Sequence, residues 1–467
     1  MRVCFVIEGS YPYITGGVSS WVHDLIQGLG EIDFVLWTIS PDSKTPLRYT
    51  LPENVIEHRN IVLTQPTQTR RKKKEPRIPR VKKSMLIREI IRAHGKMAKG
   101  EPQPLKSLIE AIPEGSNQLS NAIRYPQIWN FITHHNQKNN PIYPFSDYFW
   151  AWKSAHELIY TAFTSPAPEA DVYHAVSTGF AGLAALCAKY RKGKPFILTE
   201  HGLYHKEREM EIRKSEFVRG YQRDMWIKTY NRMSKLCYTE ADRITALFAE
   251  NRMHQLEMGA NPENTYVIPN GIPLDRFAVQ RKPREGFHVG LVGRVVPIKD
   301  IKTFINAAKI ILDTYSDATV HCIGPTDEDP GYYEDCQLLV ESLGITDRFL
   351  FTGRQNVLEY YAFLDVLMLT SIREAQPLVI LEAWCANVPA VATNVGNIGE
   401  MLDYNPHYLS PPKNPQKLAE NVFYIREHAQ EVAQTMEKNR KLLETVYSRD
   451  VLINRYRELY KDTLWQE

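Results

Sequence analysis

Short apolar runs alternate with helical patterns along most of this chain, and this alternation limits its fold more than any other feature. It is typical of parallel sheets built from strand–helix–strand units. The runs that predict a first sheet cover residues 2–8, 32–38, 171–176, 195–200, 243–248 and 265–270. Those that predict a second sheet cover residues 287–294, 318–324, 348–353, 365–370 and 389–393. Their nearly continuous apolar character indicates α/β domains whose strands are buried on both faces.

The chain has 467 residues, which is too many for one hydrophobic core and predicts two domains. A polar stretch with Pro and Gly around residues 277–286 separates the two series of strands. We therefore expect an N-terminal Rossmann-like domain over residues 1–278 and a second over residues 279–448. The apolar spacing of residues 449–467 predicts a final helix that packs back on the first domain. Two doubly wound domains facing one another across a cleft is the simplest architecture.

Residues 64–165 do not follow the alternation and predict an insertion in the first domain, with helices of its own. The insertion begins with a basic run at residues 70–83 and continues with Pro-rich and aromatic-rich sequence. The basic run fits a solvated loop. It also fits a patch that meets an acidic membrane surface or a partner protein.

Composition excludes several classes of function. The formal net charge of +3 is nearly neutral, so no global field favours nucleic acid. No apolar run approaches the roughly 20 residues of a membrane span, and residues 1–10 fit a buried strand better than a signal peptide. The six cysteines form no C-x-x-C pair, which predicts buried free thiols in a reducing cytoplasm.

Ligands of open parallel sheets bind beyond the carboxyl ends of the strands, so the loops that enter helices are the candidate sites. The first such loop holds Gly16 and Gly17, and paired glycines before a helix let a phosphate approach backbone N–H groups. G-x-G-x-x-G is absent, which disfavours an NAD enzyme. Arg294 and Lys299 flank another loop, where two cations at a helix entrance suit a diphosphate.

Two glutamates and one histidine are the other candidate site residues. Glu374 lies in the loop after residues 365–370, and Glu382 lies in the second turn of the next helix, within an otherwise apolar stretch. An ionised carboxylate there needs donors, and ribose hydroxyls, a structural Arg or a backbone group would supply them. His201 follows the predicted strand 195–200, at an end that would face the cleft, although a lone histidine is more often structural.

Taken together, "VGRVVPIK", "SIREAQPLVILEA", "VIPNGI" and the Gly-Gly-Val first loop resemble the retaining GT-B glycosyltransferases of family 4. The resemblance covers nearly the whole chain apart from residues 64–165. It implies that Arg294 and Lys299 hold the diphosphate of a UDP-sugar donor. It further implies that Glu374 binds hydroxyls of the donor sugar, that Glu382 binds the ribose, and that His201 contacts the transferred sugar.

The other positions that the resemblance assigns to donor binding act mainly through their backbone or line the cleft. They are Gly17, Asn270, Gly353, Arg354, Gln376 and Leu378. Family members often have Gly after the first glutamate, where this chain has Ala375, which puts the shape of that loop in doubt.

The resemblance implies no metal and no cofactor. The acidic triplet Asp327–Asp329 matches a metal-binding pattern of a different glycosyltransferase fold, but here the two cations Arg294 and Lys299 take the place of a metal. The sequence is most similar to enzymes of Pel-type exopolysaccharide synthesis. That similarity implies a saccharide acceptor and a cytoplasmic enzyme beside an inner-membrane export complex, docked through residues 70–83.

Two other classes of function fit the same motifs. One is a nucleotide-binding regulatory subunit without catalysis. The other is a GT-B epimerase or phosphorylase, and a phosphorylase would carry pyridoxal phosphate on a lysine.

Overall fold

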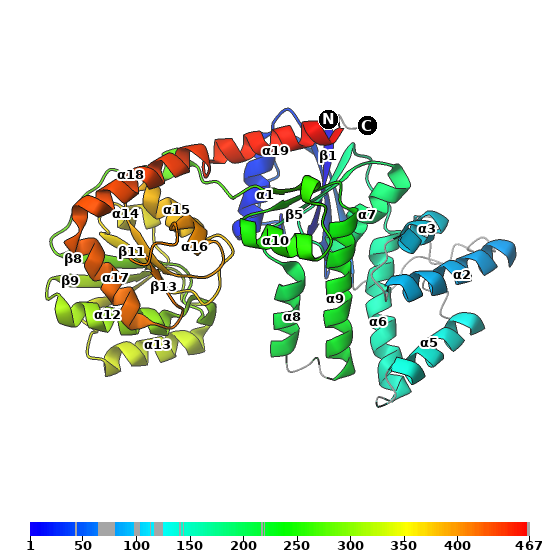
Figure 1. The fold of residues 1–467 in the computed structure, drawn as a ribbon, viewed down its shortest axis with the longest axis horizontal. Helices are drawn as coiled ribbons and strands as arrows, with labels where there is room; N and C mark the ends of the chain where they lie inside the picture. Colours follow the sequence, from blue (N-terminus) through cyan, green and yellow to red (C-terminus); the bar gives the residue numbers. More distant parts are fainter. Residues whose placement is uncertain are drawn as a thin grey trace. The chain divides into compact units, whose positions relative to one another are not determined.

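A computed structural model describes residues 1–42, 44–63, 80–97, 103–112, 114–115, 125–139, 142, 144–215, 218 and 220–464. Residues 70–79 of the predicted basic run lie outside this part of the chain. The protein forms two compact units (Figure 1). Unit 1 comprises Met1–Ile268 and Tyr456–Glu467, and unit 2 comprises Pro269–Arg455.

Unit 1 contains a seven-stranded sheet whose pairings are all parallel, in the order β3-β2-β1-β4-β5-β6-β7. The strands are β1 Arg2–Glu8, β2 Asp33–Ser40, β3 Val55–Val62, β4 Val172–Ala175, β5 Phe196–Glu200, β6 Arg243–Ala246 and β7 Thr265–Val267. The order reverses direction between β1 and β4, so this is the doubly wound arrangement that the sequence predicts.

The helices of unit 1 are α1 Gly17–Gly28, α2 Arg80–Met97, α3 Gln103–Ala111, α5 Pro126–Asn139, α6 Phe145–Thr164, α7 Phe180–Lys192, α8 Tyr204–Lys214, α9 Tyr221–Glu240 and α10 Ala249–Glu257, with a short 3-10 turn at Pro262–Asn264. Among these helices, α7, α9 and α10 pack directly on the strands of this sheet, whereas α2, α3 and α5 lie further out (Figure 1). Within the described part of the predicted insertion, α3 and α6 pack on α7, and α2 and α5 pack around them.

Unit 2 contains a six-stranded, fully parallel sheet in the order β10-β9-β8-β11-β12-β13. The strands are β8 Phe287–Val292, β9 Ala318–Ile323, β10 Phe349–Gly353, β11 Val366–Leu369, β12 Ala390–Thr393 and β13 Leu409–Ser410. The strand order again reverses, between β8 and β11. The two-domain α/β fold class predicted from the sequence is confirmed.

The helices of unit 2 form two groups: α13 and α17 each pack on α12, and α11 and α18 each pack on α15 (Figure 1). Their bounds are α11 Leu274–Phe277, α12 Ile301–Thr314, α13 Pro330–Ser342, α14 Val357–Tyr361, α15 Leu378–Cys385, α16 Ile398–Met401, α17 Pro415–Glu427, α18 Ala429–Thr445 and α19 Arg449–Leu464, with a 3-10 turn at Pro297–Lys299.

The structure corrects the expected boundary at residue 278, because the division falls between Ile268 and Pro269. Ile272 forms a backbone bridge to Ser448, and Ile272 and Phe277 are both buried in the core of unit 2. These apolar contacts outweigh the polar composition of residues 277–286, on which the prediction rested.

The final helix divides between the units, and its second half belongs to unit 1. There, the Tyr460 hydroxyl lies 2.7 Å from His174 Nδ1, and the Tyr456 hydroxyl lies 3.1 Å from Thr199 Oγ1. Arg457 is ion-paired with Glu31, next to the end of α1. The two tyrosines and the arginine thus anchor this helix on the first sheet.

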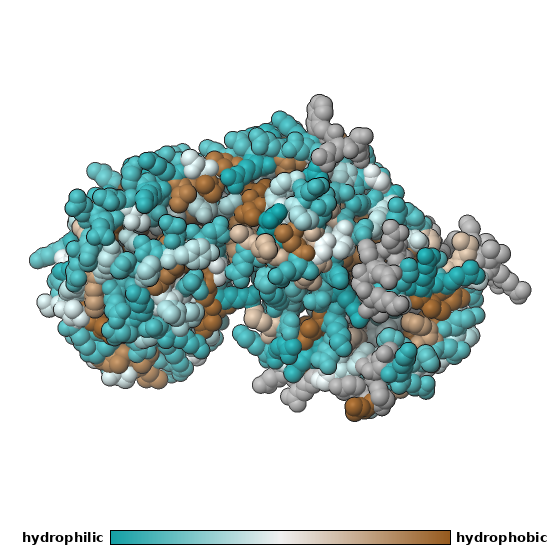
Figure 2. All heavy atoms as spheres, in the orientation of Figure 1, coloured by the Kyte–Doolittle hydropathy of each residue, from teal (hydrophilic) through white to brown (hydrophobic). Residues whose placement is uncertain are grey.

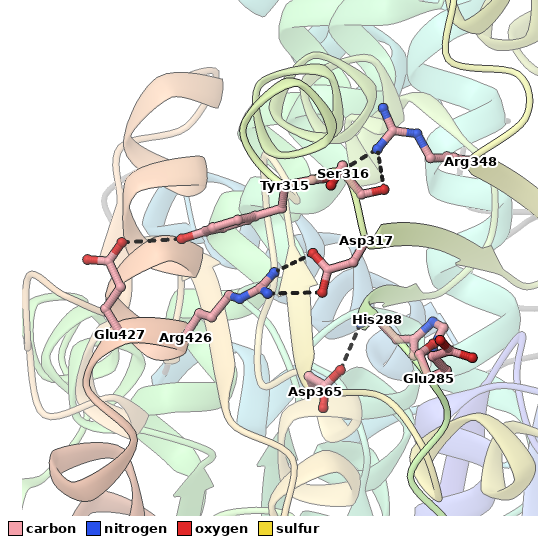
Figure 3. Close-up of polar contacts among 9 residues, drawn as sticks. All are labelled: Glu285, His288, Tyr315, Ser316, Asp317, Arg348, Asp365, Arg426 and Glu427. Carbon is pink, nitrogen blue, oxygen red and sulfur yellow. Dashed lines mark hydrogen bonds and ion pairs between the residues drawn. The ribbon is translucent and has the colours of Figure 1, made fainter.

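The amino ends of the strands in unit 2 are held by a network of hydrogen bonds around one ion pair, that of Arg426 with Asp317 (Figure 3). Arg426 donates two hydrogen bonds of 3.0 Å to Asp317, which immediately precedes β9. Its guanidinium also lies over the rings of Phe287 and Tyr315, 4.7 and 4.1 Å from their centroids. Bidentate pairing and ring contacts use the whole guanidinium group, so its role is structural.

The remaining global features concern the surface and the thiols. Apolar residues on the face drawn in Figure 2 are scattered among hydrophilic ones instead of gathering in one broad patch. All six cysteines are free, as predicted, and all except the half-buried Cys385 are buried. Among the described residues, no helix is long and apolar enough to cross a membrane.

Candidate active site

The candidate site of unit 2 is built from two loops at the carboxyl ends of β8 and β11. The β8 loop carries Arg294 and Lys299 and ends at Asp300, whose side chain caps α12. The hydroxyl of Thr370, at the end of β11, donates to the carbonyls of Lys299 and Asp300 at 2.8 and 3.1 Å. Ile372 N–H adds a bond of 2.9 Å to the carbonyl of Ile298. These bonds fix the two loops against each other.

Lys299 and Glu374 form the central ion pair of the site, with Nζ 2.5 Å from Oε1. Ser371 Oγ donates to the same carboxylate oxygen at 2.6 Å. The side chains of Lys299 and Glu374 are only 17% and 14% exposed, so this pair is screened less than a surface pair. The structure thus brings together two residues that the sequence assigns to diphosphate and sugar.

Arg294 lies in the same loop but pairs with a different acid. Its Nη1 atom is 2.6 and 2.8 Å from the two carboxylate oxygens of Glu328, in the loop after β9. Both side chains are about half exposed, at 53% and 49%. Glu328 therefore holds a guanidinium with two oxygens of one anionic group, as a phosphate would, at a place that solvent reaches. Sequence reasoning considered Glu328 only as part of a metal pattern.

Glu382 lies in α15 with a neutral donor beside it. The hydroxyl of Tyr361 donates to Oε2 at 3.1 Å. Burial raises the pKa of the Glu382 carboxyl, and the Tyr361 hydrogen bond and the charge of Arg276 oppose that rise. The carboxylate therefore has one hydroxyl partner and a nearby arginine in the described structure, and further hydroxyl donors would stabilise its ionised form.

Asn270 and Gln376 form a reciprocal pair across the site. The backbone N–H of Asn270 donates to Gln376 Oε1 at 2.8 Å, and Gln376 Nε2 donates to the Asn270 carbonyl at 3.3 Å. The side-chain Oδ1 of Asn270 is buried without a hydrogen-bond partner in the described part of the chain. A buried acceptor without a donor is costly, and a ligand N–H or O–H would satisfy it.

Two glycines bring backbone close to this edge. Gly353 ends β10 with φ of 68°, in the left-handed region, and its carbonyl accepts from Gly324 N–H at 3.0 Å. Gly396, in the loop after β12, has φ of 56°, and a Cβ there would lie 2.0 Å from the Glu374 carbonyl oxygen. A side chain at Gly396 would therefore clash with the loop, whereas at Gly353 a Cβ would meet no atom within 4 Å and only the left-handed backbone disfavours a side chain.

The two other residues of unit 2 that were predicted to bind the donor also lie at loops of this sheet. Arg354 follows Gly353 and is exposed, and Leu378 is the first residue of α15. Leu378 N–H is among the first N–H groups of that helix, which have no intrahelical acceptor.

Gly17 and His201 lie in unit 1, at the carboxyl ends of β1 and β5. Gly17 is the first residue of α1, and a Cβ built there would meet no atom within 4 Å. His201 packs edge-on against Trp21, with ring centroids 4.6 Å apart, and its Nε2 atom is buried without a partner among the described residues. Burial lowers the pKa of His201 to about 4, so the ring is neutral near pH 7 and acts as a hydrogen-bonding group.

Sequence reasoning missed two carboxylates at this edge of unit 1. Glu8, at the end of β1, accepts from the Tyr204 hydroxyl at 2.6 Å and from Phe180 N–H at 2.8 Å. Glu200, at the end of β5, accepts from the Tyr238 hydroxyl at 2.5 Å and from Gln255 at 3.1 Å. Their position directly after apolar strands, the criterion applied to Arg294, would have found both.

Burial raises the pKa of Glu8 and raises that of Glu200 to about 7, against the hydrogen bonds that favour their charged forms. Glu200 thus lies next to the predicted site residue His201 and is held by neutral donors.

The acidic triplet has identifiable structural partners. Glu328 pairs with Arg294, and Asp329 caps α13 by accepting from Tyr332 N–H at 3.1 Å. Among the described residues, no group of three or more His, Cys, Asp or Glu side chains is arranged to hold a metal ion. The carboxyl edge of unit 2 thus combines two cations, three carboxylates and an amide oxygen without a partner among the described residues, a set suited to a polar anionic ligand with hydroxyl groups.

Comparison with known proteins supports this class of site. Residues 286–427 match the family model described as glycosyl transferases group 1, so unit 2 is a domain of that type. Residues 1–263 match the model described as a domain of unknown function, DUF3492. Because that match spans more than half of the chain, the protein belongs to the DUF3492 family.

Curated relatives match part of the chain. N-acetyl-alpha-D-glucosaminyl L-malate synthase of Bacillus anthracis is 29% identical over 190 residues, which are 40% of this chain and 48% of the relative. D-inositol 3-phosphate glycosyltransferase of Geodermatophilus obscurus is 31% identical over 177 residues, 34% of this chain and 39% of the relative. The chain thus spans about half the length, or less, of these relatives.

A similar solved structure is that of HepE from Anabaena in complex with UDP. It has a TM-score of 0.64 and 15% sequence identity, and the match covers 99% of this chain and 100% of HepE. At this identity the similarity establishes the fold, which HepE shares over its full length.

Proposed function

We infer that the protein is a glycosyltransferase that moves a sugar from a UDP-sugar to an acceptor hydroxyl. The observation that carries this inference is the arrangement of Lys299, Glu374 and Arg294 on two loops that are hydrogen-bonded together at the carboxyl edge of unit 2. The family model of unit 2 and the UDP and UDP-glucose complexes of HepE support it.

In this proposal the cations bind the donor diphosphate. Arg294 exchanges Glu328 for phosphate oxygens, and Lys299 turns from Glu374 toward the same group, since both ion pairs have the geometry of a cation–anion contact that a phosphate can replace. Glu374, released from Lys299, accepts hydroxyls of the donor sugar. Glu382 and the unpartnered Oδ1 of Asn270 are the remaining acceptors for ribose or sugar hydroxyls.

We further propose that the transfer retains configuration by a front-face route. The bond between the anomeric carbon and the diphosphate oxygen breaks, the acceptor oxygen bonds to the same face of that carbon, and the leaving phosphate oxygen takes the acceptor proton. Arg294 and Lys299 stabilise the negative charge that develops on the diphosphate. His201, neutral near pH 7, offers a hydrogen bond to the transferred sugar without adding charge.

The wider biological role follows the resemblance of the first loop and the insertion to PelF, the cytosolic glycosyltransferase of Pel exopolysaccharide synthesis. We propose that the acceptor is a growing polysaccharide and that the enzyme works in the cytoplasm beside an inner-membrane export complex. The basic run at residues 70–83 is the proposed docking element. Binding and catalysis are proposed to need neither metal nor cofactor.

The first experiment measures thermal unfolding with UDP, ADP and GDP, each with EDTA and with magnesium. A ligand at a hundred times its dissociation constant stabilises the folded protein by about 2.7 kcal/mol, which shifts the midpoint measurably. We expect a shift with UDP that EDTA does not change and that Glu382→Ala reduces. The exposed residue Glu420, in α17, provides the control variant Glu420→Ala, which should leave the shift unchanged.

A panel of UDP-sugars is then screened for release of UDP with and without saccharide acceptors. Release that requires an acceptor supports transfer. A UDP-induced shift with no turnover on any sugar would favour the regulatory subunit. No shift with any nucleotide would contradict the donor site itself.

A further inference from the structure

Unit 1 contains a cavity that the proposed reaction does not use. It lies among α2, α3, α5, α6, α7 and α9 and has a volume of about 550 Å³. This volume is within the range of small-molecule sites. None of the residues assigned to the donor lines it.

One wall of the cavity is a stack of flat rings. The ring centroids of Trp152 and His156 are 3.8 Å apart, at an interplanar angle of 22°. The ring centroid of His94 is 4.9 Å from that of His156, at an interplanar angle of 14°. These three rings come from α6 and α2 and present an extended ring surface. Such a wall accepts the flat or apolar face of a ligand.

The two histidines make three polar contacts through their ring nitrogens. Nδ1 of His94 is 2.8 Å from the carbonyl of Ile90, and Nδ1 of His156 is 2.7 Å from the carbonyl of Trp152. A carbonyl only accepts, so an Nδ1 that bonds to its carbonyl must carry a hydrogen. The two Nε2 atoms are 2.8 Å apart, a hydrogen-bond distance that needs a hydrogen on one of them. All three contacts are hydrogen bonds only when the pair holds three ring hydrogens and one positive charge, whereas the neutral pair has two ring hydrogens and leaves one contact without a hydrogen.

The surroundings of the pair favour its neutral form. Burial lowers the pKa of both His94 and His156. The other ionisable side chains that line the cavity are His135 from α5, Tyr148 and Tyr160 from α6, and Tyr221, Asp224, Lys228 and Arg232 from α9, whereas α3 and α7 contribute apolar residues. Asp224 is the single carboxylate among these lining residues, against two cations at the exposed rim. The cavity thus has an excess of positive charge.

We propose that this cavity binds a small organic anion with a flat ring, which packs against the wall formed by Trp152, His156 and His94 and places its carboxylate or phosphate near Arg232, Lys228 and the histidine pair. The ligand supplies the counter-charge that the pair needs to hold a third ring hydrogen. Binding is therefore coupled to proton uptake and strengthens as the pH falls.

The test is calorimetric titration of the full chain with 1-naphthoate, 1-naphthyl phosphate and the uncharged 1-naphthalenemethanol. We expect at least one of the anions to bind at least about tenfold more tightly than the alcohol, because a hydrogen bond to a charged group contributes about 1.5–3 kcal/mol. Whichever anion binds more tightly identifies the class of headgroup. Equal affinity of the alcohol and both anions, or binding by none of the three, would overturn the proposal.

Matched variants on α9 and α6 locate the site. Arg232→Ala and Lys228→Ala should each weaken anion binding by about tenfold. Lys235→Ala, an exposed change on the same helix, should have no effect. Trp152→Leu should weaken all three probes, whereas Trp150→Leu, outside the cavity, should not. Thermal unfolding verifies that each variant is folded. An equal loss in Lys235→Ala and Arg232→Ala would refute the assignment.

The histidine pair has a separate readout. Wild-type affinity for the anion should rise between pH 8 and pH 6, and His156→Gln should abolish that rise while His407→Gln, in unit 2, preserves it. A rise that persists in His156→Gln would show that the pair does not take up the proton. Lys299→Ala should leave probe binding unchanged, which separates this cavity from the proposed donor site.

Discussion

The carboxyl ends of the two sheets hold carboxylates in contrasting surroundings. In unit 1, Glu8 and Glu200 accept hydrogen bonds from hydroxyl, amide and backbone N–H groups of the fold. In unit 2, Glu374 and Glu328 are bound by the cations Lys299 and Arg294.

The contrast separates structural carboxylates from those suited to function. The hydroxyl and N–H groups that bind the carboxylates of unit 1 are neutral. An anionic ligand therefore offers them no charge pairing, and we expect them to stay bound to the carboxylates. A lysine or arginine bound to a glutamate can exchange that glutamate for a phosphate with little change in charge. The carboxylates of unit 1 therefore fasten helix starts to strand ends, whereas the ion pairs of unit 2 are exchangeable.

Removing the two cations of unit 2 is the test of this comparison with the largest expected effect. Lys299→Ala or Arg294→Ala should lower turnover by about two to three orders of magnitude, like the loss of an oxyanion donor. The measurement is UDP release from the best UDP-sugar. Arg426→Ala is the control: it removes the structural arginine of Figure 3, and we expect a lower melting temperature with normal turnover of the folded protein. Near-normal turnover in both cation variants would refute the donor assignment.

The pH dependence of stability tests the carboxylates of unit 1. The pKa of Glu200 is about 7 in the folded protein, above the ordinary value of 4.5, so folding favours its protonated form. Its contribution to stability is complete below pH 4.5 and is lost as the pH rises through 7, by about 3 kcal/mol. Urea unfolding at several pH values should show this loss in the wild type and not in Glu200→Gln.

Glu211→Gln, an exposed change on α8, is the control and should keep the wild-type pH profile. If Glu200→Gln kept the wild-type profile, folding would not raise the pKa of Glu200, and the contrast between the two edges would fail.

A further test within unit 2 concerns Glu382, which is proposed to bind the ribose. Glu382→Ala should weaken UDP binding by about tenfold, because it removes a charged acceptor for hydroxyl groups. Calorimetry with UDP gives the affinity. Glu382→Gln should recover part of the loss, since the amide oxygen still accepts. Unchanged affinity in Glu382→Ala would assign Glu382 to the structural partners Tyr361 and Arg276.

The smallest expected effect concerns Glu328. Its pair with Arg294 is about half exposed, and such pairs contribute about 0–1 kcal/mol. Glu328→Gln should therefore strengthen UDP binding by no more than about fivefold. Weaker binding in this variant would mean that Glu328 positions Arg294 for the ligand instead of competing with it.

Much of the fold was predictable, because its strands are buried and read as continuous apolar runs. The edge strand β3, Val55–Val62, was missed because it contains Glu57, His58, Arg59 and Asn60 and is only partly buried. The strand β13, Leu409–Ser410, is too short for any pattern. The edge position and short length of these strands explain why an apolar-run criterion overlooks them.

The sequence by itself determined the two parallel sheets and the positions after their strands where charged residues enter loops, since periodicity and loop position are local properties. Only the tertiary structure decided which partners meet. Lys299 and Glu374, Arg294 and Glu328, and His94 and His156 are far apart in the chain, and their pairing depends on how strands and helices pack. Burial likewise depends on that packing, so the raised pKa of Glu200 and the lowered pKa values of His94 and His156 have no signal in the sequence.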